Sequence, residues 1–197
     1  MNKLVISLIL SFILGFPSCD NVEKKNMKIV RSFIEFSNKG DTMQLHKLLS
    51  DDFDKETILL KSNLSKESNL IDKERIILDE IRIVDKNTIK TIEHKEDVYS
   101  DFFKLDMPKY EITYFVANSK IISITIDMDK ARNKETLNKK IRHMELKISF
   151  NNWFSDKHPK FNGKDYLIEN GLTSFLLIYS KLDSSELDKY RFKIRND

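Results

Sequence analysis

The hydrophobic positions of this chain follow four successive patterns. An uncharged apolar run occupies residues 4–16, and a helical spacing of apolar residues begins at Met27. After Asp79 apolar and polar positions alternate, and from Asn133 the helical spacing returns. Spacings of three to four residues indicate helices, and alternation indicates strands. Helices followed by strands and then by further helices predict an α+β fold with an antiparallel sheet and a C-terminal helical extension.

The first helical segment is predicted from Met27 to a break at residues 38–40. Gly40 suits the C′ position that ends a helix, and Asp41 is placed to cap the helix that follows. The apolar stripe of the first helix is Ile29, Val30, Phe33, Ile34 and Phe36, and that of the second is Leu45, Leu48 and Leu49. These two short helices would pack on the sheet through their stripes.

The middle of the chain changes from helical to strand spacing. A short strand is predicted at residues 57–60 and a third helix at residues 66–78, with Leu70, Ile71, Ile77 and Leu78 on its apolar face. Strands are predicted around Ile81 and Ile83 and at residues 88–92, with a turn at residues 85–87.

The clearest strands are residues 109–116 and 120–128, joined by a hairpin turn at residues 117–119, where Asn118 tolerates a positive φ. After them, a long helix is predicted from Asn133 to a stop near His158 and Pro159. Two shorter helices follow at residues 173–182 and 184–194, the second capped by Ser184 or Ser185.

The N-terminal apolar run has the features of an export signal. It follows Lys3 and is shorter than the roughly 20 residues that a membrane span needs. It ends just before Ser18 and Cys19, the single cysteine of the 197 residues. The segment resembles a bacterial lipoprotein signal, in which a small residue precedes a cysteine that is diacylated on sulfur and becomes the mature N-terminus. The alternative is an ordinary signal peptide or an uncleaved anchor beside a chance cysteine.

The lipoprotein interpretation divides the chain into four parts. Residues 1–18 are the signal, 19–26 a polar tether, 27–130 the main domain and 131–197 the C-terminal helical extension. Two acyl chains on Cys19 would hold the exported protein on the periplasmic or surface face of a bacterial membrane. The formal net charge of +3 becomes +2 without Lys3, with 33 basic against 31 acidic side chains, and we expect no nucleic-acid partner.

A family resemblance covers roughly residues 26–130. The segment from Ile29 to Asp41, with Leu45, Leu48 and the exit from Leu49 to Phe53, resembles the opening of nuclear transport factor 2-like domains, which include polyketide cyclases and ketosteroid isomerases. Residues 110–128 are similar to the last hairpin of that family. The resemblance implies a cone-shaped curved antiparallel sheet packed on the N-terminal helices, with a pocket at its open end. Many members of the family bind a small apolar ligand in that pocket, some catalyse proton transfer, and many others only bind or dimerise.

Proton transfer would need a carboxylate or imidazole facing a tyrosine in an apolar pocket. Glu93, His94 and Asp97 are the candidates, with Tyr99, Tyr110 and Tyr114 as partners. The alternative is that residues 93–97, a run of charges, form a solvated strand end. The chain carries no pattern from which a catalytic role can be assigned, so no catalytic residue is named.

The candidates for lining a ligand pocket are aromatic, namely Tyr99, Phe103, Tyr110, Tyr114 and Trp153. Aromatic residues at strand spacing are more often core, and Trp153 with Phe154 would also serve to pack the extension onto the cone. The four histidines, His46, His94, His143 and His158, lack metal-ligand spacing, so we expect neither a metal nor a cofactor.

Three hypotheses follow. The preferred one is a membrane-anchored, non-catalytic lipoprotein that binds a small apolar ligand or a protein partner. The second is a cyclase-like or isomerase-like enzyme that uses Glu93, His94 or Asp97 with a tyrosine. The third is an interaction module whose open sheet face forms a homodimer or binds another protein.

Overall fold

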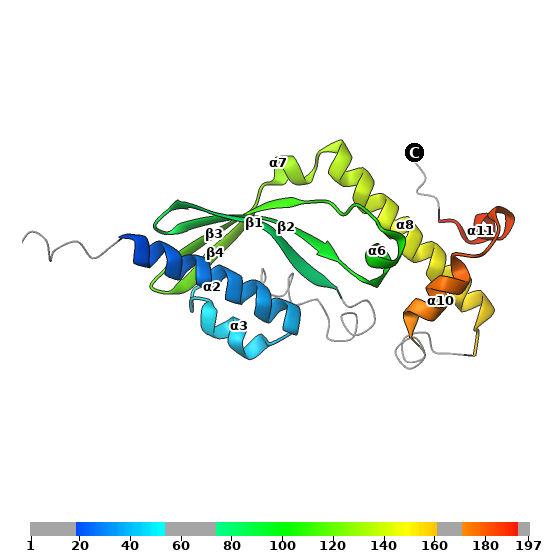
Figure 1. The fold of residues 1–197 in the computed structure, drawn as a ribbon, viewed down its shortest axis with the longest axis horizontal. Coiled ribbons are helices and arrows are strands. Elements are labelled where there is room, and N and C mark those ends of the chain that lie inside the picture. Colours follow the sequence, from blue (N-terminus) through cyan, green and yellow to red (C-terminus); the bar gives the residue numbers. More distant parts are fainter. Residues whose placement is uncertain (1–18, 54–73, 161–170, 193–197) are drawn as a thin grey trace, which may run out of the picture.

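The structure is a computed structural model that describes residues 19–53, 74–160 and 171–192. The strand predicted at 57–60, most of the helix predicted at 66–78 and the end of the last predicted helix lie outside these residues. Within them the chain has the predicted α+β composition, with a four-stranded antiparallel sheet and several helices (Figure 1).

The sheet is a simple meander in which each strand pairs with its neighbour in sequence. Strands β1 (Arg75–Asp85), β2 (Thr88–Glu96), β3 (Tyr110–Ala117) and β4 (Lys120–Ile126) lie in the order β1-β2-β3-β4. The register places Glu93 opposite Tyr110. The pairing of the four strands confirms the antiparallel strands predicted after Asp79.

One predicted element is wrong where it enters the described chain. Ile77 and Leu78, assigned to the end of a helix, lie in β1, where Ile77 pairs with His94. Three successive apolar residues, 76–78, fit a buried strand as well as a helix face, so periodicity could not decide between them. The hydrogen bonds to β2 decide for the strand.

The first helix begins earlier than predicted. Helix α2 spans Cys19–Lys39, so residues 19–26 are helical and do not form an extended tether. Asn26 is buried, and its Nδ2 donates a hydrogen bond of 2.6 Å to the carbonyl oxygen of Lys86 in the β1–β2 turn. A polar residue can occupy the buried face of a helix when it is hydrogen-bonded in this way.

The break between the first two helices forms as predicted. Gly40 has a φ of 64°, and Asp41 caps helix α3 (Thr42–Leu48) by accepting a hydrogen bond of 3.0 Å from the backbone amide of Gln44. The β3–β4 turn is also confirmed, because Asn118 and Ser119 both have positive φ, as a type I′ turn requires.

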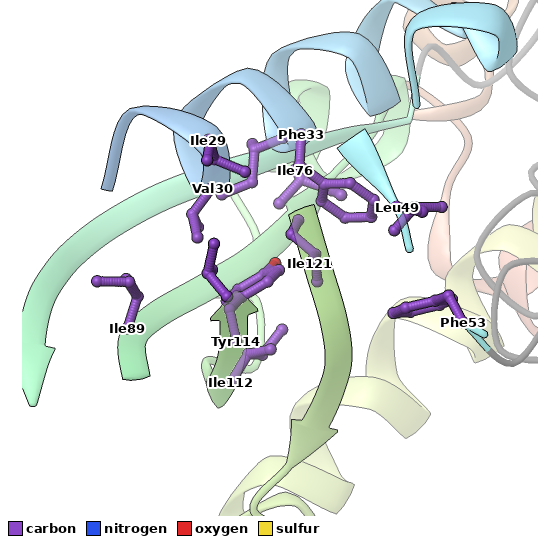
Figure 2. Packing of buried hydrophobic residues seen from close by; sticks show 12 residues of the cluster. Ile29, Val30, Phe33, Leu49, Phe53, Ile76, Ile89, Ile112, Tyr114 and Ile121 are labelled. Carbon is purple, nitrogen blue, oxygen red and sulfur yellow. The ribbon is translucent and has the colours of Figure 1, made fainter. Parts of the chain in front are cut away.

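Helix α2 packs on one face of the sheet and forms the first hydrophobic core. Phe33 of α2 meets Tyr114 of β3 edge to face, with the ring centroids 5.9 Å apart (Figure 2). The buried members of this core are Ile29, Val30, Phe33, Ile34, Leu49, Phe53, Ile76, Ile89, Ile112, Tyr114, Val116 and Ile121.

The C-terminal helices form where predicted, but the last two end earlier, at Tyr179 and Tyr190, and one cap differs. Asn133 caps the long helix α8 (Lys134–Lys157), and α10 covers Leu172–Tyr179. Helix α11 (Ser184–Tyr190) is capped by Asp183, whose carboxylate accepts hydrogen bonds from the backbone amides of residues 185 and 186. Ser184 and Ser185 therefore lie inside the helix.

A second hydrophobic core joins these helices to a short one that the sequence did not reveal. Helix α6 (Val98–Phe103) follows β2, and its Tyr99 packs edge to face on Phe150 of α8, with centroids 5.6 Å apart. Trp153 and Phe154 of α8 complete this core with Tyr179 of α10. Figure 1 shows α2 and the sheet toward one end of an elongated molecule and α10 and α11 at the other, with α6 and α8 between them. The four-residue helix α7 (Met128–Ala131) leads from β4 to α8.

Candidate functional site

A cavity of about 210 Å³ lies where the sheet meets the C-terminal helices. Residues 95–97 at the end of β2 line one side together with Glu74, and Lys140 and His143 of α8 line another. Tyr110, at the start of β3, contributes a phenol ring, and residues 107 and 108 complete the wall. The cavity therefore combines carboxylates, an imidazole and a phenol from segments far apart in the sequence.

Asp97 is the central residue of this cavity. Its carboxylate caps α6 by accepting a hydrogen bond of 2.9 Å from the amide of Ser100, and the Ser100 hydroxyl accepts one of 2.8 Å from the amide of Asp97. Nε2 of His143 lies 3.0 Å from each oxygen of the same carboxylate, and Nζ of Lys147 lies 3.5 Å from Oδ2. One side chain thus connects β2, α6 and α8.

The environment of Asp97 stabilises its charged form. Its side chain is only 4% exposed, and this burial alone would raise the pKa of the carboxyl. The hydrogen bonds from His143 and from the amide of Ser100, with the charge of Lys147, outweigh burial and lower the pKa below its ordinary value. A carboxylate held in this way orients an imidazole well but is a poor base itself.

His94 belongs to a neighbouring ion-pair network. Its Nδ1 lies 2.7 Å from Oδ2 of Asp79, and its Nε2 lies 3.1 Å from Oε1 of Glu96. A histidine ring can donate to both carboxylates only as the imidazolium. Burial opposes the ionisation of Asp79, but hydrogen bonds from His94 and Lys109 hold the pKa of its carboxyl below the ordinary value.

Arg75 extends this network toward the second core. It contacts Glu96 at 2.7 Å and Asp101 of α6 at 2.9 Å, so the network fastens the start of β1 to β2 and α6. Both ring nitrogens of His94 face carboxylates of the protein itself.

Glu93 forms a separate buried pair on the face of the sheet that α2 covers. Its Oε1 accepts hydrogen bonds from the hydroxyl of Tyr114 at 2.7 Å and from that of Thr91 at 2.6 Å. Burial, then the charge and hydrogen bond of Glu93, raise the pKa of the Tyr114 phenol well above its ordinary value.

Glu93 and Asp97, taken as whole residues, are each 3% exposed, so the prediction of a solvated strand end is wrong for these two residues. Between them Lys95 is half exposed, and Asp97 follows the last residue of β2 as the cap of α6.

The five aromatic pocket candidates do not meet at one site. Tyr99, Phe103 and Trp153 belong to the second core, Tyr114 lies in the first core, and only Tyr110 lines the cavity. Trp153 packs the extension against α6 and α10 rather than against the first core. Apart from Tyr110, the aromatic candidates belong to the two hydrophobic cores, which was the alternative interpretation of their spacing.

Sequence reasoning missed the role of His143. It is 46 residues from Asp97, and no local spacing connects the two. A local signal exists only for Asp97. This residue is followed by Ser100 directly before an apolar segment, a pattern that is typical of a helix N-terminus and would have placed Asp97 at a cap.

On the opposite face of the sheet, Glu111 gathers three cations. Its carboxylate accepts hydrogen bonds from Lys90 at 2.7 Å, Lys130 at 3.0 Å and Arg82 at 3.2 Å. The hydrogen bonds from the two lysines are the main reason why the pKa of Glu111 falls to about 2. This cluster connects β1, β2 and β3 to α7.

Two further properties concern the described residues only. No three histidine, cysteine, aspartate or glutamate side chains among them are arranged to hold a metal ion. Nor does any helix in that part of the chain combine the length and apolar character that crossing a membrane requires.

Comparison of the chain with protein families, with curated proteins and with solved structures finds no match. The resemblance to nuclear transport factor 2-like domains therefore stays a prediction, and the function has to be argued from the residues themselves.

Proposed function

We propose that this protein is a membrane-anchored cell-envelope lipoprotein whose domain binds a small apolar ligand or a protein partner without catalysis. The observation that supports the anchor is the position of Cys19, which follows an apolar run and opens helix α2. Lipid on this residue would join directly to the folded domain.

Binding is favoured over catalysis because the acids of the cavity are already paired. Glu74 pairs with Lys95, Glu96 with Arg75, and Asp97 with Lys147. A carboxylate with a fixed cationic partner is less available as a base. The cavity is also smaller than the roughly 300 Å³ at which ligand pockets begin, which favours a protein partner or a very small ligand.

The proposed fold is the cone of nuclear transport factor 2-like domains. A helix pair followed by an antiparallel meander supports it, as does the packing of α2 across one face of the sheet. A crystal structure of protein purified from its host would test both cone and ligand, because a co-purified molecule in the cavity lined by Tyr110 and His143 supports the proposal. An empty cavity in such a crystal would favour the protein-partner version.

The anchor is tested by metabolic labelling with an alkyne analogue of palmitate, followed by membrane fractionation. The wild-type protein should incorporate the label and remain in the membrane fraction after a high-salt wash. Cys19→Ala should lose the label, whereas Ser18→Ala, which keeps a small residue before the cysteine, should retain it. Labelling of Cys19→Ala at the wild-type level would exclude the lipoprotein assignment.

The second candidate is an enzyme that transfers protons. What favours it is that Asp97, His143 and Tyr110 line the same cavity, with His143 oriented by Asp97. Incubation with a panel of small ketones in D₂O, followed by NMR, would detect α-proton exchange. Exchange catalysed by wild type and lost in His143→Gln would support the enzyme, and no exchange above buffer for any ketone would leave binding as the function.

A further inference from the structure

The end of the molecule that carries Cys19 is built from three segments. Asn26 of α2 is bonded to the carbonyl of Lys86 in the β1–β2 turn, and the amide of Val116 donates a hydrogen bond of 2.7 Å to the carbonyl of Asn87 in the same turn. The start of α2 and both hairpin turns therefore lie together, as the left side of Figure 1 shows, while α10 and α11 lie at the far end.

This end is close to the lipid-bearing residue. A helix rises about 1.5 Å per residue, so the seven residues from Cys19 to Asn26 cover only about 10 Å. The headgroup region on one side of a bilayer is roughly 5–8 Å thick. With no extended tether, the β1–β2 turn has to sit at or just above the headgroups once Cys19 is anchored.

Two exposed valines occur at this end. Val22 is 49% exposed and lies four residues before the buried Asn26, on the same face of α2. Val84 is 53% exposed, and it is the unpaired residue of a bulge between the pairs formed by Ile83 and Asp85. Aliphatic side chains at the membrane–water boundary gain free energy by leaving water.

In the sequence this end carries the four lysines Lys24, Lys25, Lys28 and Lys86 and the three acids Asp20, Glu23 and Asp85, so its net charge is 4 − 3 = +1. The carboxylate of Asp85 accepts a hydrogen bond of 2.8 Å from the amide of Asn87 and keeps its negative charge, so the excess of lysine over acid at this end is a single charge. Lysine side chains near an anionic membrane surface are attracted to it by about 1 kcal/mol each. The charge of this end suits anionic phospholipid headgroups.

We propose that this end, comprising the start of α2 and the β1–β2 turn, docks on an anionic phospholipid surface, with Val22 and Val84 at the headgroup boundary. The inference rests on the proposed anchoring through Cys19 and adds an orientation to it. The sheet then stands on the membrane by its hairpin end, and the C-terminal helices point away from the bilayer.

The lone cysteine makes the test simple, because lipidation consumes the only native thiol. Full-length lipoprotein carrying Val84→Cys is labelled there with a nitroxide and reconstituted in vesicles of phosphatidylcholine and phosphatidylglycerol. The matched control is Ile178→Cys on α10, an exposed apolar site at the far end. Collisions with a water-soluble nickel complex should be several-fold fewer at position 84 than at position 178.

The outcomes separate the two proposals. Protein that fails to float with the vesicles overturns both the anchor and the docking. Protein that floats but is equally accessible at both positions overturns the docking alone, and supports a domain that swings freely or binds another molecule at this end. Protection at position 84 that is unchanged in pure phosphatidylcholine overturns the role of the lysines.

Discussion

Both oxygens of the Asp97 carboxylate lie 3.0 Å from Nε2 of His143, across the boundary between the two hydrophobic cores. The same carboxylate caps α6, whose aromatic residues belong to the second core. The buried carboxylate of Asp97 thus connects the end of β2 to α8, which follows the last strand of the sheet in the chain. The attachment of the C-terminal helices depends on this pair as well as on aromatic packing.

Asp97→Asn should destabilise the fold by about 2–4 kcal/mol, because it leaves His143 and Lys147 facing a neutral group in a buried site. Asparagine is itself a good helix cap, so the loss reports the ion pair rather than the cap. Urea unfolding followed by the fluorescence of Trp153, the single tryptophan, reports the second core. Far-UV circular dichroism of the same samples reports the whole chain.

In the variant the Trp153 transition should precede the loss of secondary structure. The control is Asp188→Asn, whose carboxylate pairs with Arg191 at the surface with both side chains about 60% exposed. Such pairs contribute little, so a change below about 0.5 kcal/mol is expected. Equal midpoints for Asp97→Asn and wild type would contradict the coupling of the two cores through Asp97.

Elements with strong local signals could be predicted from the sequence. Alternation defined β3 and β4, Asn118 marked their turn, and Asp41 and Asn133 were placed at helix starts that the structure confirms. In each case the residues that determine the conformation are neighbours in the chain.

Features that depend on distant contacts could not be predicted. The start of β1 is a strand because β2 pairs with it, and Asn26 is a buried helix residue because the Lys86 carbonyl accepts its hydrogen bond. The Asp97–His143 pair joins residues from different halves of the chain. The local pattern indicates at most that Asp97 caps a helix, and it does not indicate that His143 is its partner.

Glu111→Gln should change the pH dependence of stability. The folded-state pKa of Glu111 is about 2, against an ordinary value of 4.5. Because the pKa is lowered by folding, the charged glutamate stabilises the fold above pH 4.5, and this contribution is lost as the pH falls toward 2. Since Arg82 and Lys130 are about 60% exposed, solvent screening limits the contribution to about 1–2 kcal/mol.

Urea midpoints measured from neutral pH down to about pH 3 check this. Wild type should be more stable than Glu111→Gln at neutral pH, and the difference should shrink below pH 4.5. Asp79 and Asp97 also have lowered pKa values, but they are common to both proteins and cancel in the comparison. A constant difference across the range would show that the cations do not act through the charge of Glu111.

Tyr114→Phe should destabilise the fold by about 1.5–3 kcal/mol, the usual range for a hydrogen bond to a charged group. The ring and its contact with Phe33 are kept, but Glu93 is left with Thr91 as its hydroxyl donor. Tyr110→Phe is the matched control, since Tyr110 lies opposite Glu93 and no hydrogen bond of its hydroxyl is found among the described residues. Chemical denaturation that ranked the two variants equally would argue against a structural role for the Glu93–Tyr114 pair.

Ser119→Gly should stabilise the fold by about 0.5–1 kcal/mol. Ser119 has a φ of 63°, a left-handed conformation that is costly for residues with a Cβ atom and free of that cost for glycine. Ser123→Gly, in the extended backbone of β4, should instead destabilise by a similar amount, because glycine there only adds flexibility to the unfolded chain. Opposite shifts in the urea midpoint are therefore expected from the same chemical change made four residues apart. If both variants lose stability, the strain at the turn is smaller than the entropy that glycine adds to the unfolded state.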